Sequence, residues 1–71
     1  MPISDRLREL RKIRGITQKD VCDGISVSRF VYQRYEYGQD PAFDKFIALA
    51  DYFDVSLDYL AGRTDKPEIN R

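Results

Sequence analysis

The chain has 71 residues, with 12 basic and 12 acidic side chains, no histidine and one cysteine. The chain is too short for a large buried active site, and it has too few histidines and cysteines for a His/Cys metal cluster or an internal disulfide. No stretch approaches the roughly 20 apolar residues that a membrane helix needs. We therefore expect one small domain in the cytoplasm, where a lone thiol stays reduced, with no cofactor, small-molecule ligand or membrane partner.

The first predicted helix lies between Ser4 and Gly15. Its apolar residues recur at steps of three and four, which places them on one face of a helix. They are Ile3, Leu7, Leu10 and Ile13. Ser4 is expected to cap the start of this helix, and Gly15 is expected to end it.

Residues 17–38 predict two short helices joined by a tight turn. Thr17 and Asp20 form a T-x-x-D capping box at the start of the first of these helices. Ser28 supplies a second cap eleven residues later. Two helices this close in sequence meet at a steep angle, which is the helix-turn-helix arrangement whose second helix can enter the major groove of DNA.

Two more helices are predicted after Gly38. Asp40 and Pro41 predict a cap followed by proline at the first helical position, and a broad apolar stripe follows. Its members are Phe43, Phe46, Ile47, Leu49, Ala50 and Phe53. Ser56 is expected to cap a last short helix, in which Leu57 and Leu60 face inward and which Gly62 ends. Residues 64–71 lack apolar periodicity, so we expect a domain over residues 1–63 and a flexible C-terminal tail over 64–71.

Three long segments occur in a characteristic order and spacing. They are RLRELRKIRGITQKD, ISVSRFVYQRYEYG and LADYFDVSLDYLAGRTDKP. Through these segments the chain resembles the Cro/CI-like, or xenobiotic-response-element, class of bacterial and phage repressors. The resemblance covers nearly the whole chain and implies an all-α, compact, five-helix, lambda-repressor-like DNA-binding domain, with the helix-turn-helix formed by helices two and three. It also implies a double-stranded DNA operator as the partner and a homodimer as the binding form.

The resemblance implies DNA contacts at the starts of helices two and three. Gln18 is implied to hold a phosphate, helped by the free backbone N–H groups of a helix start. Lys19 and Tyr37 are further candidates for phosphate contacts, although most surface lysines are only solvated. Base contacts are expected on the face of the third helix opposite Tyr32 and Tyr35, which are implied to be buried. The candidates are Ser28, Arg29, Phe30, Gln33 and Arg34.

The chemistry of these candidates matches different bases. Arginine can make two hydrogen bonds to guanine, glutamine can make two to adenine, and a phenyl ring can cover a thymine methyl. For Phe30 a protein partner or a dimer contact remains an alternative to thymine. Arg11 and Glu36 are implied to form a structural pair that ties the third helix to the first.

Two positions depart from the family pattern. Ser26 replaces the glycine that the family prefers in the turn, and positive φ costs a serine about 1–2 kcal/mol. Cys22 replaces a small residue, usually alanine, and we interpret it as a packing residue.

The charge distribution adds to the functional prediction. Residues 1–38 hold eight basic and five acidic side chains, net +3, while residues 39–71 hold four and seven, net −3. The resemblance implies a repressor that binds a palindromic operator as a dimer. Together with this charge distribution, it leads us to predict a sequence-specific transcriptional regulator that uses residues 28–37 as the recognition helix. The dimer contact is expected on the last helix, around Leu57 and Tyr59.

The sequence also bears on two other function classes. The alternative is a protein-interaction module on the same fold, such as an antitoxin or an antirepressor, favoured by the overall neutral charge and by the aromatic residues Phe30 and Tyr37. An enzyme is not expected, because the chain lacks a paired nucleophile and base.

Overall fold

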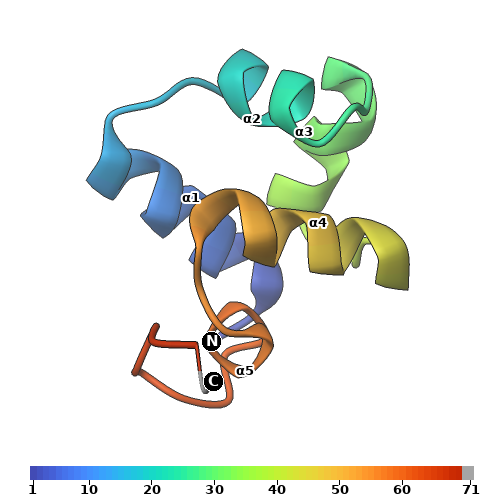
Figure 1. Cartoon of the computed structure of the whole chain (residues 1–71). Coiled ribbons are helices and arrows are strands. Elements are labelled where there is room, and N and C mark those ends of the chain that lie inside the picture. The colour runs from blue at the N-terminus through green and yellow to red at the C-terminus, as the bar shows by residue number, and fades with distance from the viewer. Residues whose placement is uncertain (70–71) are drawn as a thin grey trace.

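The computed structural model describes residues 1–69, and this range forms five α-helices and no strand (Figure 1). The helices are α1 (Ile3–Arg14), α2 (Gln18–Gly24), α3 (Arg29–Glu36), α4 (Phe43–Phe53) and α5 (Leu57–Leu60). The predicted all-α, five-helix fold is therefore confirmed. Within residues 1–69 no helix is long and apolar enough to cross a membrane. Residues 70 and 71, the last two of the predicted tail, lie outside the described residues.

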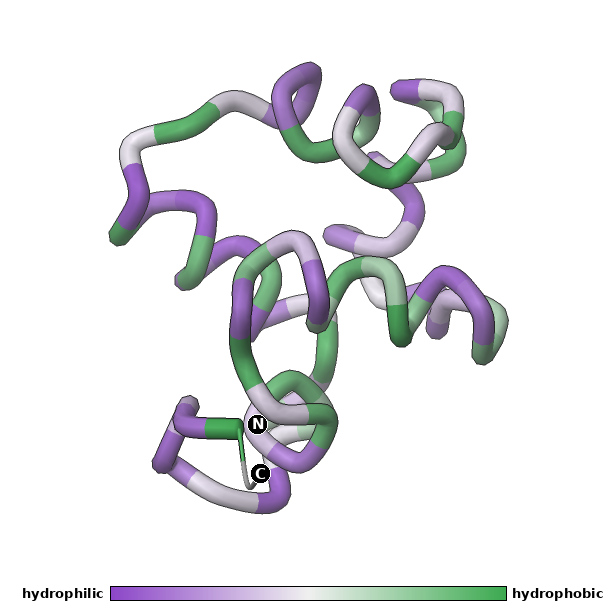
Figure 2. Tube along the Cα trace, viewed as in Figure 1, coloured by the Kyte–Doolittle hydropathy of each residue, from purple (hydrophilic) through white to green (hydrophobic). Residues whose placement is uncertain are grey.

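The helices pack around one core. α1 contacts both α3 and α5, and α2 packs on α3. α2 and α3 lie at one end of the molecule, and α5 lies at the other end beside the N-terminus (Figure 1). Hydrophilic and hydrophobic residues alternate along the turns of α1, as an amphipathic helix requires (Figure 2). The side chains with no more than 1% exposure include Leu7, Val21, Tyr32, Leu49, Phe53 and Leu60.

Three of the predicted helix caps are present. At α2 the Thr17 hydroxyl accepts a hydrogen bond from the Asp20 backbone N–H at 3.1 Å, and the Asp20 carboxylate accepts one from the Thr17 N–H at 2.9 Å. The Ser28 hydroxyl accepts a hydrogen bond from the Val31 N–H at the start of α3, and the Ser56 hydroxyl accepts one from the Tyr59 N–H at the start of α5. These caps satisfy backbone donors that have no partner inside the helix.

Two predicted helix starts were wrong. α1 begins at Ile3 with Pro2 in the cap position, so Ser4 lies inside the helix, and α4 begins at Phe43 with Ala42 in the cap position. Neither helix has a side-chain cap, and Pro41 belongs to the connection before α4. A cap contributes only about 1 kcal/mol, so packing of the helix body can set the start instead.

The predicted apolar faces extend too far at their ends. Ile13, Phe43 and Leu57 are 71%, 73% and 43% exposed, although each was expected to face inward. Ile13 lies in the last turn of α1, and the other two are the first residues of α4 and α5. These terminal turns project beyond the core, so their periodic position does not bury them.

The turn between α2 and α3 contains Ser26, one of the two departures from the family pattern, and it follows a close contact at Gly24. Ser26 adopts φ 60°, the left-handed conformation that was expected to be strained. Gly24 ends α2 against α4, where an added Cβ would lie 2.2 Å from a ring carbon of Tyr52. Only a residue without a side chain allows this approach. Cys22 is 2% exposed, which confirms its role in packing.

Candidate nucleic-acid interface

α3 has one buried and one exposed face. Tyr32, Tyr35 and Glu36 are 0%, 6% and 1% exposed, so the prediction that both tyrosines face the core is confirmed. Their rings pack edge to face at a centroid separation of 6.3 Å. Four of the five predicted base-contact residues are exposed, and the fifth, Gln33, is half-buried beside α2. The exposed four are Ser28, Arg29, Phe30 and Arg34.

Phe30 and Arg34 form a pair on the exposed face of α3. Phe30 is 67% exposed, and the Arg34 guanidinium carbon lies 5.1 Å from the centre of its ring. A cation over a phenyl ring is attracted by its negative face. This contact holds an apolar surface and a fork of hydrogen-bond donors next to each other, a combination suited to neighbouring base edges.

Arg11 and Glu36 join the first helix to the end of the third. The Arg11 Nε lies 2.8 Å from Oε2 of Glu36, and its Nη2 lies 3.0 Å from Oε1, so the pair has two hydrogen bonds. The Arg11 side chain is 22% exposed and that of Glu36 is 1% exposed. Arg8 also donates to the backbone carbonyl of Glu36 at 2.5 Å. Two arginines of α1 thus hold the end of α3.

Charge states around this pair are well defined. Burial alone would raise the pKa of Glu36, but hydrogen bonds from Arg11 and Gln18 outweigh it and hold that pKa below its usual value. The hydrogen bond to Glu36 raises the pKa of Arg11. Burial, and then the neighbouring Glu36 carboxylate, raises the pKa of the Tyr32 phenol. At neutral pH, Glu36 is therefore a carboxylate and Tyr32 is neutral.

Gln18 extends this polar group toward the surface. As the first residue of α2, it donates from Nε2 to Oε1 of Glu36 at 3.2 Å, and its Oε1 accepts a hydrogen bond from Nε2 of Gln33 at 3.2 Å. The two glutamines predicted to contact DNA are thus bonded to each other. Sequence reasoning missed this link, although the start of α2 and the middle of α3 are neighbours in any helix-turn-helix.

The other two phosphate candidates are exposed. Lys19 forms an ion pair with Asp23 one turn later, at 2.7 Å between Nζ and Oδ2, and this hydrogen bond raises the pKa of Lys19. Tyr37 follows the last residue of α3 and is 78% exposed. Both side chains are therefore accessible to a partner.

Tyr59 does not provide the exposed surface that was expected for a dimer contact. It is 7% exposed, and the Arg6 guanidinium lies 3.9 Å from the centre of its ring. Arg6 is itself 4% exposed and donates to the Tyr59 carbonyl at 3.0 Å and to the Thr64 carbonyl at 3.2 Å. α5 has only four residues, and its buried residues Tyr59 and Leu60 face α1 and α4. Leu57 is the apolar residue of this helix that remains exposed.

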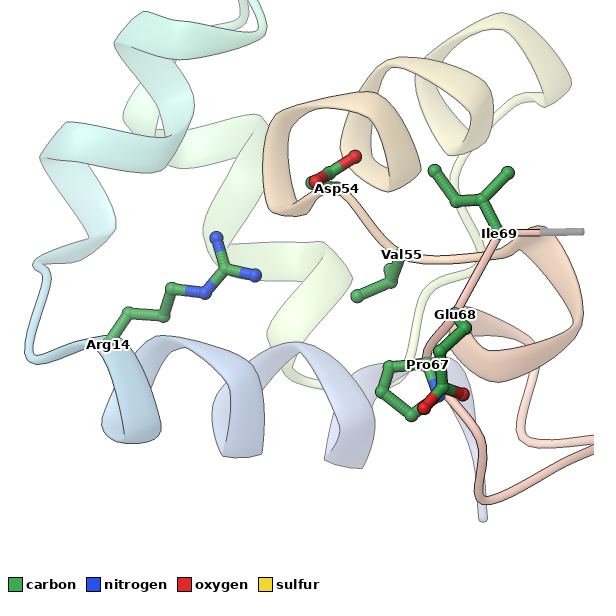
Figure 3. A pocket seen from close by; sticks show the side chains of 6 residues that line it. All are labelled: Arg14, Asp54, Val55, Pro67, Glu68 and Ile69. Atoms are coloured by element: carbon green, nitrogen blue, oxygen red, sulfur yellow. The ribbon is translucent and has the colours of Figure 1, made fainter. Parts of the chain in front are cut away.

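A surface pocket lies elsewhere on the molecule. It lies between the end of α1, the α4–α5 connection and residues 67–69, and none of its lining residues belongs to α2 or α3 (Figure 3). The lining residues are Arg14, Asp54, Val55, Pro67, Glu68 and Ile69. The exposed face of α3 and the pocket are therefore separate surfaces.

Comparison with known proteins gives consistent matches. Residues 7–60 match a family described as helix-turn-helix. The chain is 39% identical over 64 residues to the HTH-type transcriptional regulator YobD of Bacillus subtilis and 36% identical over 64 residues to the cryptic phage CTXphi transcriptional repressor RstR of Vibrio cholerae. Both alignments cover 89% of this chain and 57% of the relative. The HTH-type transcriptional regulator ImmR of Bacillus subtilis is 31% identical over 71 residues, or 99% of this chain and 56% of that protein. The chain thus spans a little over half the length of these relatives.

Proposed function

Since the chain belongs to the helix-turn-helix family of the Cro/CI-like type, we propose that it is a transcriptional regulator that binds double-stranded DNA in a sequence-specific manner. The observation that carries this proposal is the two-sided character of α3. Its buried side is fixed by Tyr32, Tyr35 and Glu36, while its other side presents exposed arginines and a phenyl ring. A rigid helix with a free polar face is what readout in the major groove requires.

In the proposed complex α3 lies in the major groove and its exposed face reads base edges. Arg29 and Arg34 pair with guanine, and Phe30 covers a thymine methyl beside the base that Arg34 contacts. Gln18, Lys19 and Tyr37 contact phosphates on either side and fix the register of the helix. The net charge of +3 on residues 1–38 supports an approach with this half toward the DNA.

The regulator is proposed to act as a repressor in the cytoplasm, and RstR, which is named as a repressor, supports this direction.

Two copies would bind a palindromic operator, with half-site centres about 34–36 Å apart. Leu57 of α5 is the remaining exposed apolar residue of the expected dimer contact. The proposed DNA-binding unit comprises residues 1–63. Residues 64–69 lie against this unit, because the Thr64 carbonyl accepts a hydrogen bond from Arg6 and the Pro67 carbonyl accepts one from the Ser56 N–H.

Selection of bound duplexes from a random pool tests this proposal. We expect a recurring sequence made of two inverted half-sites, and binding to it that weakens steeply with added salt because phosphate contacts release counterions. A pool that shows no enriched sequence, together with salt-insensitive binding to random duplex, would contradict the proposal. That result would favour the alternative of a protein-interaction module.

A further inference from the structure

We propose that the buried Glu36 sets the direction in which the Gln33 amide faces the DNA, so that Gln33 selects adenine over guanine. This inference rests on the proposed function, because it requires α3 to lie in the major groove. The feature behind it is the series of side-chain hydrogen bonds that runs from Glu36 through Gln18 to Gln33.

The first link fixes Gln18. The Glu36 carboxylate is 1% exposed and held by Arg11, so it has only acceptor atoms to offer. Gln18 can therefore approach it only with an amide N–H, and its Nε2 lies 3.2 Å from Oε1 of Glu36. A glutamine amide can normally turn over with little change in shape. Here the carboxylate removes that freedom, and the carbonyl oxygen of Gln18 must point the other way.

The second link passes this direction on to Gln33. The Gln18 oxygen is an acceptor, so Gln33 must donate to it, and its Nε2 lies 3.2 Å away. Gln33 lies between the buried Tyr32 and the exposed Arg34, on the part of α3 nearest α2. With one N–H committed to Gln18, Gln33 retains one free N–H and the carbonyl oxygen for a base.

This pair of free groups matches adenine. In the major groove adenine offers an amino donor at N6 and an acceptor at N7, which the oxygen and the second N–H of Gln33 can meet together. Guanine offers two acceptors, O6 and N7. An unrestrained glutamine could turn both N–H groups toward them, but Gln33 has one already in use. Its oxygen would then face an acceptor.

Binding measurements on single-base variants of the selected duplex test the inference. The 71-residue protein is expected to prefer A·T to G·C at one base pair of each half-site by roughly 5- to 150-fold, the range for a two-hydrogen-bond contact. Gln33→Ala should remove that preference and so identify the base pair. Gln18→Met, which keeps the length of the side chain but has no amide, should reduce the preference at the same base pair at least fivefold.

Two control variants separate this effect from other losses. Gln18→Met also removes a proposed phosphate contact, so the affinity of this variant should fall on every duplex. The relevant quantity is therefore the ratio of its affinities for the duplex with A·T and the duplex with G·C at the base pair that Gln33 contacts. Lys19→Ala should lower affinity for all duplexes while leaving the ratio intact. Arg34→Ala should change preference at a different base pair. Glu36→Gln, checked for folding by circular dichroism, should also reduce this ratio. An amide at position 36 offers both a donor and an acceptor, so it no longer fixes which end of the Gln18 amide faces it.

The outcomes distinguish the inference from its premise. If no duplex is enriched, the proposed function fails and the inference fails with it. If a sequence is enriched but Gln33→Ala changes no base preference, Gln33 does not read a base and only the inference is overturned. A preference for guanine at the Gln33 position, or a ratio that Gln18→Met leaves unchanged, also overturns it. If Glu36→Gln does not fold, Gln18→Met decides the result alone.

Discussion

Arg11→Ala should destabilise the fold more than Glu36→Ala, although both variants break the same ion pair. Arg11→Ala leaves the Glu36 carboxylate, whose side chain is 1% exposed, without its charged partner. This carboxylate keeps the hydrogen bond that it accepts from the Gln18 amide. Removing one partner of a buried pair costs about 3–5 kcal/mol. Glu36→Ala leaves a guanidinium that is 22% exposed and still donates to the Ile16 carbonyl, so we expect a loss of about 2 kcal/mol.

These losses are large for this domain. A chain of this length has a free energy of unfolding of about 4–11 kcal/mol. A loss of 3 kcal/mol would lower the melting temperature by about 12–24 °C. The assay is urea unfolding followed by circular dichroism. Lys19→Ala, which removes the exposed ion pair with Asp23, serves as the control and should leave the midpoint unchanged.

The pH dependence of Arg11→Ala provides a second test. In the parent the lowered pKa of Glu36 means that its contribution to stability is present above about pH 4.5 and is lost as the pH falls further. Without Arg11, burial raises the pKa of Glu36 above its value in the unfolded chain. The penalty then grows as the pH rises, so the stability gap between variant and parent should shrink from pH 7 to pH 5. An equal gap at both pH values, or a variant no less stable than Glu36→Ala, would refute the buried-carboxylate argument.

Three further predictions concern other parts of the molecule. Arg34→Ala should cost about 1–3 kcal/mol of binding at one base pair of the selected duplex; an equal loss on random duplex would mean that it contacts only phosphate. Gly24→Ala should destabilise the fold by about 1–3 kcal/mol, because the new methyl overlaps the Tyr52 ring. Thermal melting checks this, and adding Tyr52→Leu should restore part of the loss, whereas no restoration would place the strain elsewhere. The raised pKa of Tyr32 means that stability should fall as the pH rises above 10, where the unfolded chain ionises this phenol. Tyr32→Phe should reduce that slope in alkaline urea titrations, and an unchanged slope would contradict the assignment.

The parts of the fold that sequence predicted well depend on local chemistry. Thr17, Ser28 and Ser56 cap their helices because the hydroxyl and the backbone N–H that it satisfies are only three residues apart. The burial of Tyr32 and Tyr35 followed from helical periodicity and the family pattern. Such features need no knowledge of how the helices meet.

The parts that sequence missed depend on contacts between distant residues. Periodicity indicates which face of a helix is apolar but not where the core ends, so Ile13 and Phe43 were assigned to it wrongly. In the sequence Arg6 is one more basic residue of α1. In the structure it is buried and donates hydrogen bonds to the backbone carbonyls of Tyr59 and Thr64, which lie 53 and 58 positions further along the chain. The bond between Gln18 and Gln33 likewise requires the packing angle of α2 on α3, which no local pattern encodes.

The position of Met1 has a practical consequence. Its backbone lies against Gly62 beside α5, where an added Cβ would come within 1.8 Å of the Met1 carbonyl oxygen, and α3 lies at the other end of the molecule (Figure 1). A fluorophore or a surface tether attached ahead of Met1 would therefore extend away from the recognition helix. Immobilised or labelled protein prepared in this way keeps α3 open to duplex DNA, whereas labels on lysine would also react with Lys19 beside that helix.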